Sequence, residues 1–349
     1  MKAQKEGVLF MPIQHRWVLG LAAGAGALSI AVTSSLIIIA QHFVEELSRP
    51  HSPLDARNIT WTLPNPEPEP SASQRRSILF HTTDGTLLSG DFWAQPQPAP
   101  TIIICHGYRI NRTFLRPVAA LEYKHGYNVL LFDFRGHGES ESIATSGGNA
   151  EIRDLEAALA VARQQAETIP GKIVIHGFSM GASVALLLEP QPDVVAIVAD
   201  SPYARLDEIL KRIMHWQLTN ESTSWAPCMY PLRNGFHALT WATLAVSRIV
   251  FRLRFGHALN ARPATSFKRW QVRSKSLIHQ SYPPILLIHG VKDSAIPITH
   301  AHQIVTQALA YNITIETYFV DAADHCGAYG NDPQQYIQVL KQFIARNLD

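Results

Sequence analysis

The sequence predicts an α/β protein whose central sheet is mostly parallel and carries helices on both faces. Short apolar segments rich in β-branched residues alternate with segments of helical periodicity. This order is expected when parallel strands are joined by right-handed helical crossovers. Most of the expected strands are apolar at every position, which indicates burial on both faces of the sheet.

Each expected element can be placed by its residues. The first two strands, 77–82 and 86–94, flank the turn residues Asp84 and Gly85, a pair that is typical of hairpins. The later strands are expected at 101–105, 128–134, 172–177, 194–200, 285–290 and 313–320. Helical patterns lie between or after them, at 150–167, 180–189, 299–310 and 333–347.

Length and composition agree with this class and exclude several others. The 349 residues allow two domains at roughly 150 residues each, although α/β domains are often larger. With 46% apolar and 17% charged residues, the chain is not disordered. The 30 Lys and Arg nearly balance the 28 Asp and Glu, so the basic excess of a nucleic-acid-binding domain is missing. Three cysteines in this length exclude a disulfide scaffold, and none lies in a CxxC pair that would indicate a zinc or redox site.

The amino-terminal part predicts a transmembrane helix. A tail, 1–16, contains Lys2, Lys5 and Arg16, and residues 17–44 contain no Asp, Glu, Lys or Arg. About 20 apolar residues span a bilayer as a helix. A cleavable signal peptide is an alternative, but its apolar region is normally only about 7–15 residues long. A buried helix of a globular domain is a third interpretation.

The flanking segments predict an orientation and a spacer. Three Lys or Arg precede the apolar segment and two lie within 41–60. The positive-inside rule therefore favours a cytoplasmic amino end and a following domain on the non-cytoplasmic side, by a margin of one charge. Residues 45–76 are expected to be a linker, because prolines occupy alternate positions from Pro64 to Pro70. Such a run is a stiff polyproline II spacer.

The sharpest motif is a G-x-S-x-G at 177–181, with Ser179 at its centre. It follows an expected strand and opens an expected helix, which is the placement that a nucleophile elbow requires. An acyl-transfer site also needs two N–H donors directed at the developing oxyanion. We expect these to be the backbone N–H groups of Met180 and of Tyr108, which follows the strand 101–105. His106 is expected to brace this loop.

Two further residues complete a predicted triad. Asp293 and His325 each follow an expected strand, and Ser179, Asp293 and His325 occur in the chain order of the α/β hydrolases. A serine hydroxyl needs a neighbouring base, and the base needs a carboxylate that fixes its tautomer. Asp321 and Asp324 are rivals for the carboxylate.

Other side chains that could carry chemistry are interpreted as structural. His300 and His302 lack the accompanying cysteines or carboxylates of a metal site. Cys105 and Cys326 are read as small buried residues rather than reactive thiols. The sequence therefore predicts neither a metal nor a cofactor.

Several motifs together resemble the α/β-hydrolase superfamily, and most closely its membrane-anchored serine hydrolases of the Bem46-like and serine-aminopeptidase-like type. The resemblance covers residues 77–349 and rests on FDFRGHGES (132–140), GFSMGA (177–182), DSPYARL (200–206), HGVKD (289–293) and ADHCGAY (323–329). It implies the α/β-hydrolase fold and a Ser-His-Asp triad. It does not imply one substrate, because relatives include carboxylesterases, monoacylglycerol lipases, protein depalmitoylases and peptidases.

The segment 201–282 matches no motif of this family and is expected to be an inserted helical cap. It holds four of the seven tryptophans, and 12 Lys and Arg against 3 Asp and Glu. The net charge of +2 is therefore the sum of a cap near +9 and a remainder near −7. The basic cap is either a solvated edge or a surface that binds anionic lipid head groups.

The sequence as a whole predicts a membrane-anchored serine hydrolase that cleaves carboxylic ester or thioester bonds through an acyl-enzyme. A small-molecule or lipid-like acyl substrate and a membrane are the expected partners, and nucleic acid is not. A serine peptidase on the same fold and a non-catalytic binding protein are the alternatives.

Overall fold

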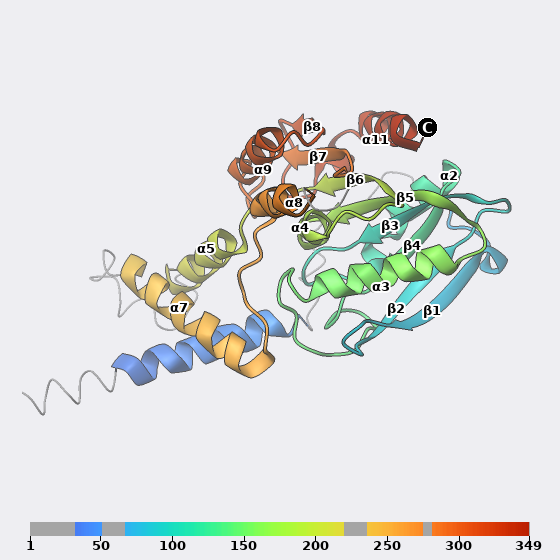
Figure 1. The fold of residues 1–349 in the computed structure, drawn as a ribbon. Coiled ribbons are helices and arrows are strands. Elements are labelled where there is room, and N and C mark those ends of the chain that lie inside the picture. Colours follow the sequence, from blue (N-terminus) through green and yellow to red (C-terminus); the bar gives the residue numbers. More distant parts are fainter. Residues whose placement is uncertain (1–31, 51–66, 220–235, 275–280, 349) are drawn as a thin grey trace, which may run out of the picture.

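The computed structural model describes residues 32–50, 67–219, 236–274 and 281–348. Its centre is an eight-stranded sheet in the order β1-β2-β4-β3-β5-β6-β7-β8 (Figure 1). β1 and β2 form the antiparallel end, and the strands from β4 to β8 pair in parallel. The strands are β1 Arg75–His81, β2 Leu87–Trp93, β3 Ala99–Cys105, β4 Asn128–Phe132, β5 Thr168–Phe178, β6 Val194–Asp200, β7 Ile285–Gly290 and β8 Ile315–Val320.

Helices cover both faces of the sheet, as the strand composition predicted. On β3, Ile103 and Cys105 belong to one apolar cluster, whereas Ile102 and Ile104 belong to the other. This alternation explains why the strands are apolar at every position. One face packs against α3 Glu151–Gln164, α4 Met180–Leu187, α8 Ser266–Ser274 and α9 Thr299–Ala310. The other packs against α2 Arg116–Lys124, α10 Ala328–Asn331 and α11 Pro333–Leu348.

The segment between β6 and β7 is helical, at the place expected for the cap. It contains α5 Leu206–Thr219, α7 Phe236–Phe255, the short 3-10 helix η4 Pro263–Thr265 and α8. Leu210 and Met214 of α5 and Leu244 and Phe251 of α7 are buried in a third apolar cluster, which lies apart from the two clusters of the sheet.

The amino-terminal helix, described over 32–48, belongs to this third cluster. Phe43 and Val44 are buried against the cap, and Glu45 pairs with Arg254 of α7 at 2.6 Å. The helix thus continues beyond residue 45, where the sequence predicted the start of a spacer. Phe43 and Val44 fix the end of this helix against the cap, so the first residues of the segment 45–76 are helical.

The predicted transmembrane segment 17–44 lies partly outside the described residues, since the structure describes it only from residue 32. Among the helices that the structure describes, none combines the length and the apolar character that a membrane span needs.

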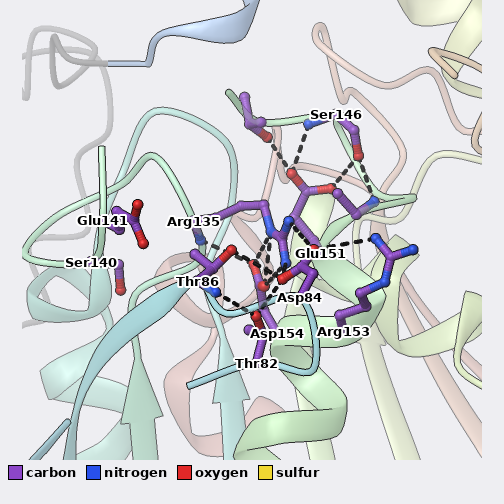
Figure 2. A network of polar contacts seen from close by, with 12 residues as sticks. Thr82, Asp84, Thr86, Arg135, Ser140, Glu141, Ser146, Glu151, Arg153 and Asp154 are labelled. Carbon is purple, nitrogen blue, oxygen red and sulfur yellow. Dashed lines mark hydrogen bonds and ion pairs between the residues drawn. The ribbon is translucent and has the colours of Figure 1, made fainter. Parts of the chain in front are cut away.

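A buried polar network fastens the loops that follow β4 (Figure 2). The Arg135 guanidinium, 2% exposed, pairs with Asp154 of α3 at 2.7 Å and with Asp84 of the β1–β2 turn at 2.9 Å. The fully buried carboxylate of Glu151 accepts hydrogen bonds from the side chains of Thr145 and Ser146 at 2.6 Å each. The β1–β2 turn and the segment that follows β4 are therefore held against the start of α3.

Replacing Arg135 by Met is expected to lower the free energy of unfolding by about 3–5 kcal/mol, because Asp154 would remain buried without its cation. Arg153 provides the matched control. It pairs with the same Asp84 at 3.3 Å but is 42% exposed, so Arg153→Met should cost no more than about 1 kcal/mol. Urea denaturation of both variants measures the difference, and equal losses would contradict the assigned role of the buried pair.

Candidate active site

Ser179 lies on the tight turn between β5 and α4, as the G-x-S-x-G motif predicted. Its backbone angles are φ 53° and ψ −111°, a conformation that costs a non-glycine residue of order 1–3 kcal/mol. The surroundings hold it there. The Ser179 N–H donates to the carbonyl of Asp200 at 2.8 Å, and the Ser179 carbonyl accepts from Ser183 N–H at 3.0 Å.

The two glycines of the motif allow this turn to form. A Cβ at Gly181 would lie 2.2 Å from the carbonyl oxygen of Cys105 at the end of β3. A Cβ at Gly177 would lie 2.5 Å from the backbone nitrogen of Ala182. Both distances are far shorter than a van der Waals contact, so only glycine lets α4 start this close to β3 and β5.

The structure brings Ser179, His325 and Asp293 together from three separate loops. His325 Nε2 lies 2.9 Å from Ser179 Oγ, and His325 Nδ1 lies 2.8 Å from Asp293 Oδ2. Asp293 follows β7 and is buried, and its other oxygen accepts from the N–H groups of Ala295 at 3.0 Å and Ile296 at 2.7 Å. The carboxylate is thereby fixed in orientation beneath the imidazole.

This arrangement sets the protonation of His325. Because Asp293 accepts only, Nδ1 carries the proton in the neutral form of His325, and Nε2 then presents its lone pair to Ser179. Burial lowers the pKa of His325, but the neighbouring Cys326 and the Asp293 carboxylate outweigh burial, and the pKa stands well above the ordinary value. Burial also raises the pKa of the Cys326 thiol, which is therefore neutral, so the effective charge is that of Asp293.

Of the three candidate carboxylates near His325, only Asp293 is hydrogen-bonded to its ring. Asp324 instead accepts from the backbone N–H of His325 at 2.8 Å and of Ser294 at 2.7 Å. It thus ties the loop of His325 to the loop of Asp293. Asp321 lies exposed at the end of β8.

The loop after β3 lies against the serine, as expected for an oxyanion loop. A Cβ at Gly107 would be 3.3 Å from the Cβ of Ser179. His106 braces this loop: its Nε2 accepts from the Phe134 N–H at 2.9 Å, so its Nδ1 carries the proton and donates to the Gly107 carbonyl at 2.7 Å. Burial lowers the pKa of His106 to about 4, which keeps the ring neutral.

The two N–H groups predicted for the oxyanion, of Met180 and Tyr108, belong to the residues that follow Ser179 and Gly107 in the chain. Met180 is the first residue of α4, and the N–H groups of a first helical turn have no partner within the helix. Tyr108 directly follows Gly107, and its hydroxyl donates to the carbonyl of Leu47 at 2.8 Å. The amino-terminal helix therefore fixes the side chain of a residue whose backbone N–H is a candidate donor.

A buried chain of polar groups behind His325 was missed by the sequence reasoning. Ser201 Oγ accepts the N–H of Cys326 at 3.0 Å and donates to Asp200 at 2.9 Å. The Tyr336 hydroxyl donates to Asp200 at 3.2 Å and lies 3.1 Å from His176. Ser201 and Cys326 both have positive φ, 54° and 50°. Asp200 and Ser201 belong to the DSPYARL motif of the sequence. The structure shows that this motif supports the turn of His325 through the hydrogen bond from Cys326 to Ser201.

The remaining candidates are structural. Cys105 and Cys326 are buried, and burial raises the pKa of both thiols. His300 is buried, and its Nδ1 accepts from the Ala204 N–H at 3.2 Å. In the part of the chain that the structure describes, no group of three or more His, Cys, Asp or Glu side chains could hold a metal ion.

The chain is similar to several known proteins in sequence or in structure. An uncharacterized protein of Bacillus subtilis, YqkD, is 27% identical over 279 residues, which are 78% of this chain and 79% of YqkD. The thiohydrolase aneE of Aspergillus aculeatus is 33% identical over 112 residues, 31% of this chain and 35% of aneE. A crystal structure of the Pyrococcus furiosus esterase Pf2001 matches with a TM-score of 0.57 and 25% identity, covering 79% of this chain and 92% of that chain.

The family assignment rests on the chain's own sequence and topology. The sequence profile of the alpha/beta hydrolase family matches residues 102–339. These residues include the elbow of Ser179, the loops of Asp293 and His325, and the cap. The parallel part of the sheet and the strand order agree with that match. The chain belongs to the alpha/beta hydrolase family.

Proposed function

We propose that this protein is a membrane-anchored serine hydrolase that cleaves carboxylic ester or thioester bonds. The observation that carries the proposal is the chain of short contacts from Asp293 through His325 to Ser179, at 2.8 and 2.9 Å. A hydroxyl, an imidazole and a buried carboxylate in this order constitute an activated nucleophile.

In the proposed reaction, Ser179 Oγ attacks the acyl carbonyl carbon while His325 Nε2 takes the hydroxyl proton. The N–H groups of Met180 and Tyr108 stabilise the oxyanion of the tetrahedral intermediate. The intermediate collapses as the protonated His325 donates its proton to the leaving alcohol or thiol, and an ester forms on Ser179. Water, deprotonated by His325, then releases the acid and restores the serine. No step needs a cofactor or metal.

An acyl ester or thioester is supported as substrate by two relatives. The Pyrococcus protein is called an esterase, and the Aspergillus protein a thiohydrolase. A lipid-like acyl group would fit an enzyme held at a bilayer. A peptidase would use the same catalytic residues, and comparison of ester and amide substrates distinguishes the two classes.

The membrane anchor is proposed from the sequence. Residues 17–44 lack Asp, Glu, Lys and Arg, and the charges on either side favour a catalytic domain on the non-cytoplasmic side. The structure describes the end of this segment as a helix that leads directly into the cap cluster. A folded domain that begins at the end of the anchor would hold its active site close to the bilayer.

The substrate class is tested with matched acyl donors. We expect the full chain to turn over p-nitrophenyl esters and acyl thioesters, with a rapid first burst of nitrophenol if the acyl-enzyme accumulates. Aminoacyl p-nitroanilides should be hydrolysed far more slowly, because the carbonyl of an anilide is less electrophilic than that of an ester or thioester. Turnover of the nitroanilides alone would replace the esterase proposal by the peptidase.

A further inference from the structure

The cap helix α7 has an inverted distribution of side chains. Its buried side carries the hydroxyl residues Thr240, Thr243 and Ser247 beside Leu244 and Phe251. Its opposite side exposes large apolar residues: Trp241 by 58%, Ile249 by 60% and Leu253 by 83%. These three residues follow a spacing of eight and four, so they share one face. A helix that faced water would place polar side chains on this face.

Exposed apolar side chains concentrate at this end of the molecule. Of the ten large apolar residues exposed in the described part of the chain, seven belong to helix 32–48, α5 and α7. They are Val32, Ile37, Ile38, Ile213, Trp241, Ile249 and Leu253. Figure 1 shows these three helices extending together from one end of the molecule, away from β1 and β2. An apolar surface that is concentrated at one end indicates a partner there.

Cations border the exposed face of α7. The Lys211 ammonium lies 3.6 Å from the centroid of the Trp241 ring, and Arg252 is exposed on the same side of the helix as Ile249. The cap segment as a whole contains 12 Lys and Arg against 3 Asp and Glu. An apolar face with aromatic and aliphatic residues, bordered by Lys and Arg, is characteristic of a helix that lies in a membrane interface.

We propose that the outer face of α7 lies on an anionic lipid bilayer, with Trp241, Ile249 and Leu253 among the upper acyl chains and Lys211 and Arg252 at the head groups. The inference rests on the membrane location proposed above, and it adds a second contact besides the anchor. The helix 32–48, which packs on α7, continues from the charge-free residues 17–31 of the sequence. The proposed face therefore adjoins the part of the chain that would enter the bilayer.

Charge favours lipid over a second copy of the chain. Two copies that met through this face would bring together two caps of net charge near +9 each, which repel one another. Anionic head groups instead attract each Lys or Arg near the surface by about 1 kcal/mol.

The contact can be measured in the full chain with a fluorescent label at single positions. The background variant Cys228→Ser removes the third cysteine, and the other two, Cys105 and Cys326, are buried. In this background a thiol-reactive label attaches to the cysteine introduced by Leu253→Cys. Leu79→Cys is the matched control: Leu79 is 69% exposed but lies on the edge strand β1, on the side of the molecule away from α7 (Figure 1). Vesicles of phosphatidylcholine with phosphatidylglycerol carry bromine on their acyl chains as the quencher. We expect quenching at position 253 to exceed that at 79 several-fold, and to weaken without phosphatidylglycerol.

The outcomes distinguish the membrane anchor, the contact of α7 with lipid and a contact between two copies of the chain. Protein that fails to float with the vesicles contradicts the anchor. Protein that floats, with no more quenching at 253 than at 79, contradicts the contact of α7 and leaves the anchor standing. Shielding of position 253 that depends on protein concentration rather than on lipid would assign the face to a second copy and overturn the proposal.

A functional experiment gives an independent readout. The double variant Ile249→Glu, Leu253→Glu should lose several-fold in hydrolysis of an ester embedded in anionic vesicles, because carboxylates would replace the inserted side chains. Its turnover of a water-soluble p-nitrophenyl ester should equal that of the wild type, which also shows that the fold and the triad are intact. Equal loss on both substrates, or loss on neither, argues against docking through α7.

Discussion

Replacing Ser179 by Ala is expected to lower kcat for ester hydrolysis by a factor on the order of 10⁶, the loss seen when the nucleophile of a serine triad is removed. The reason is geometric: Ser179 Oγ lies 2.9 Å from His325 Nε2. A fluorophosphonate probe should label the wild type and leave Ser179→Ala unlabelled. Far-ultraviolet circular dichroism of the two proteins should coincide.

Cys326 is the matched control for this experiment. Its Sγ lies 3.8 Å from the same His325 Nε2, so it is the neighbouring alternative nucleophile. Burial raises the pKa of its thiol, which leaves it un-ionised and unreactive. Cys326→Ala should retain probe labelling and turnover close to the wild type. Loss of labelling in Cys326→Ala but not in Ser179→Ala would move the nucleophile to the cysteine.

Replacing Asp293 by Asn should reduce kcat by a factor on the order of 10⁴, as expected when a triad carboxylate becomes an amide that favours the wrong tautomer. The pH dependence of kcat/KM should change in a defined direction. His325 must be neutral to act as the base, and the pKa of His325 is held above its ordinary value by Asp293. In the wild type, kcat/KM should therefore rise with pH through a midpoint above the ordinary histidine value of about 6.5. In Asp293→Asn the midpoint should move to lower pH.

Asp324→Asn tests whether this effect is specific. Asp324 lies one residue from His325, but it accepts backbone N–H groups through one oxygen that an amide retains. We expect kcat within a few-fold of the wild type and a smaller downward shift of the pH midpoint than in Asp293→Asn, because Asp324 acts on the imidazole through its charge alone. If Asp324→Asn shifts the midpoint and Asp293→Asn does not, the assignment of the orienting carboxylate is wrong.

Periodicity and motif placement predicted most of the fold and identified the candidate site residues. The strands that are buried on both faces left a continuous apolar signal, and the G-x-S-x-G between strand and helix located Ser179. β1 begins at Arg75, two residues before the predicted start of the domain, because its first residues are charged and carry no apolar pattern. The helix 32–48 contacts the cap through Phe43 and Val44, a tertiary contact that its own composition does not indicate.

The sequence by itself determined the class of sheet, the elbow of Ser179 and the chain order of Ser179, Asp293 and His325, because these depend on local patterns. The tertiary structure separated Asp293 from its rival Asp324, since Asp293 is buried and bonds to the imidazole, whereas Asp324 is exposed and accepts backbone N–H groups. It also revealed the support of Cys326 by Ser201 and the exposed apolar face of α7. Those features depend on contacts between residues far apart in the chain, which no local pattern records.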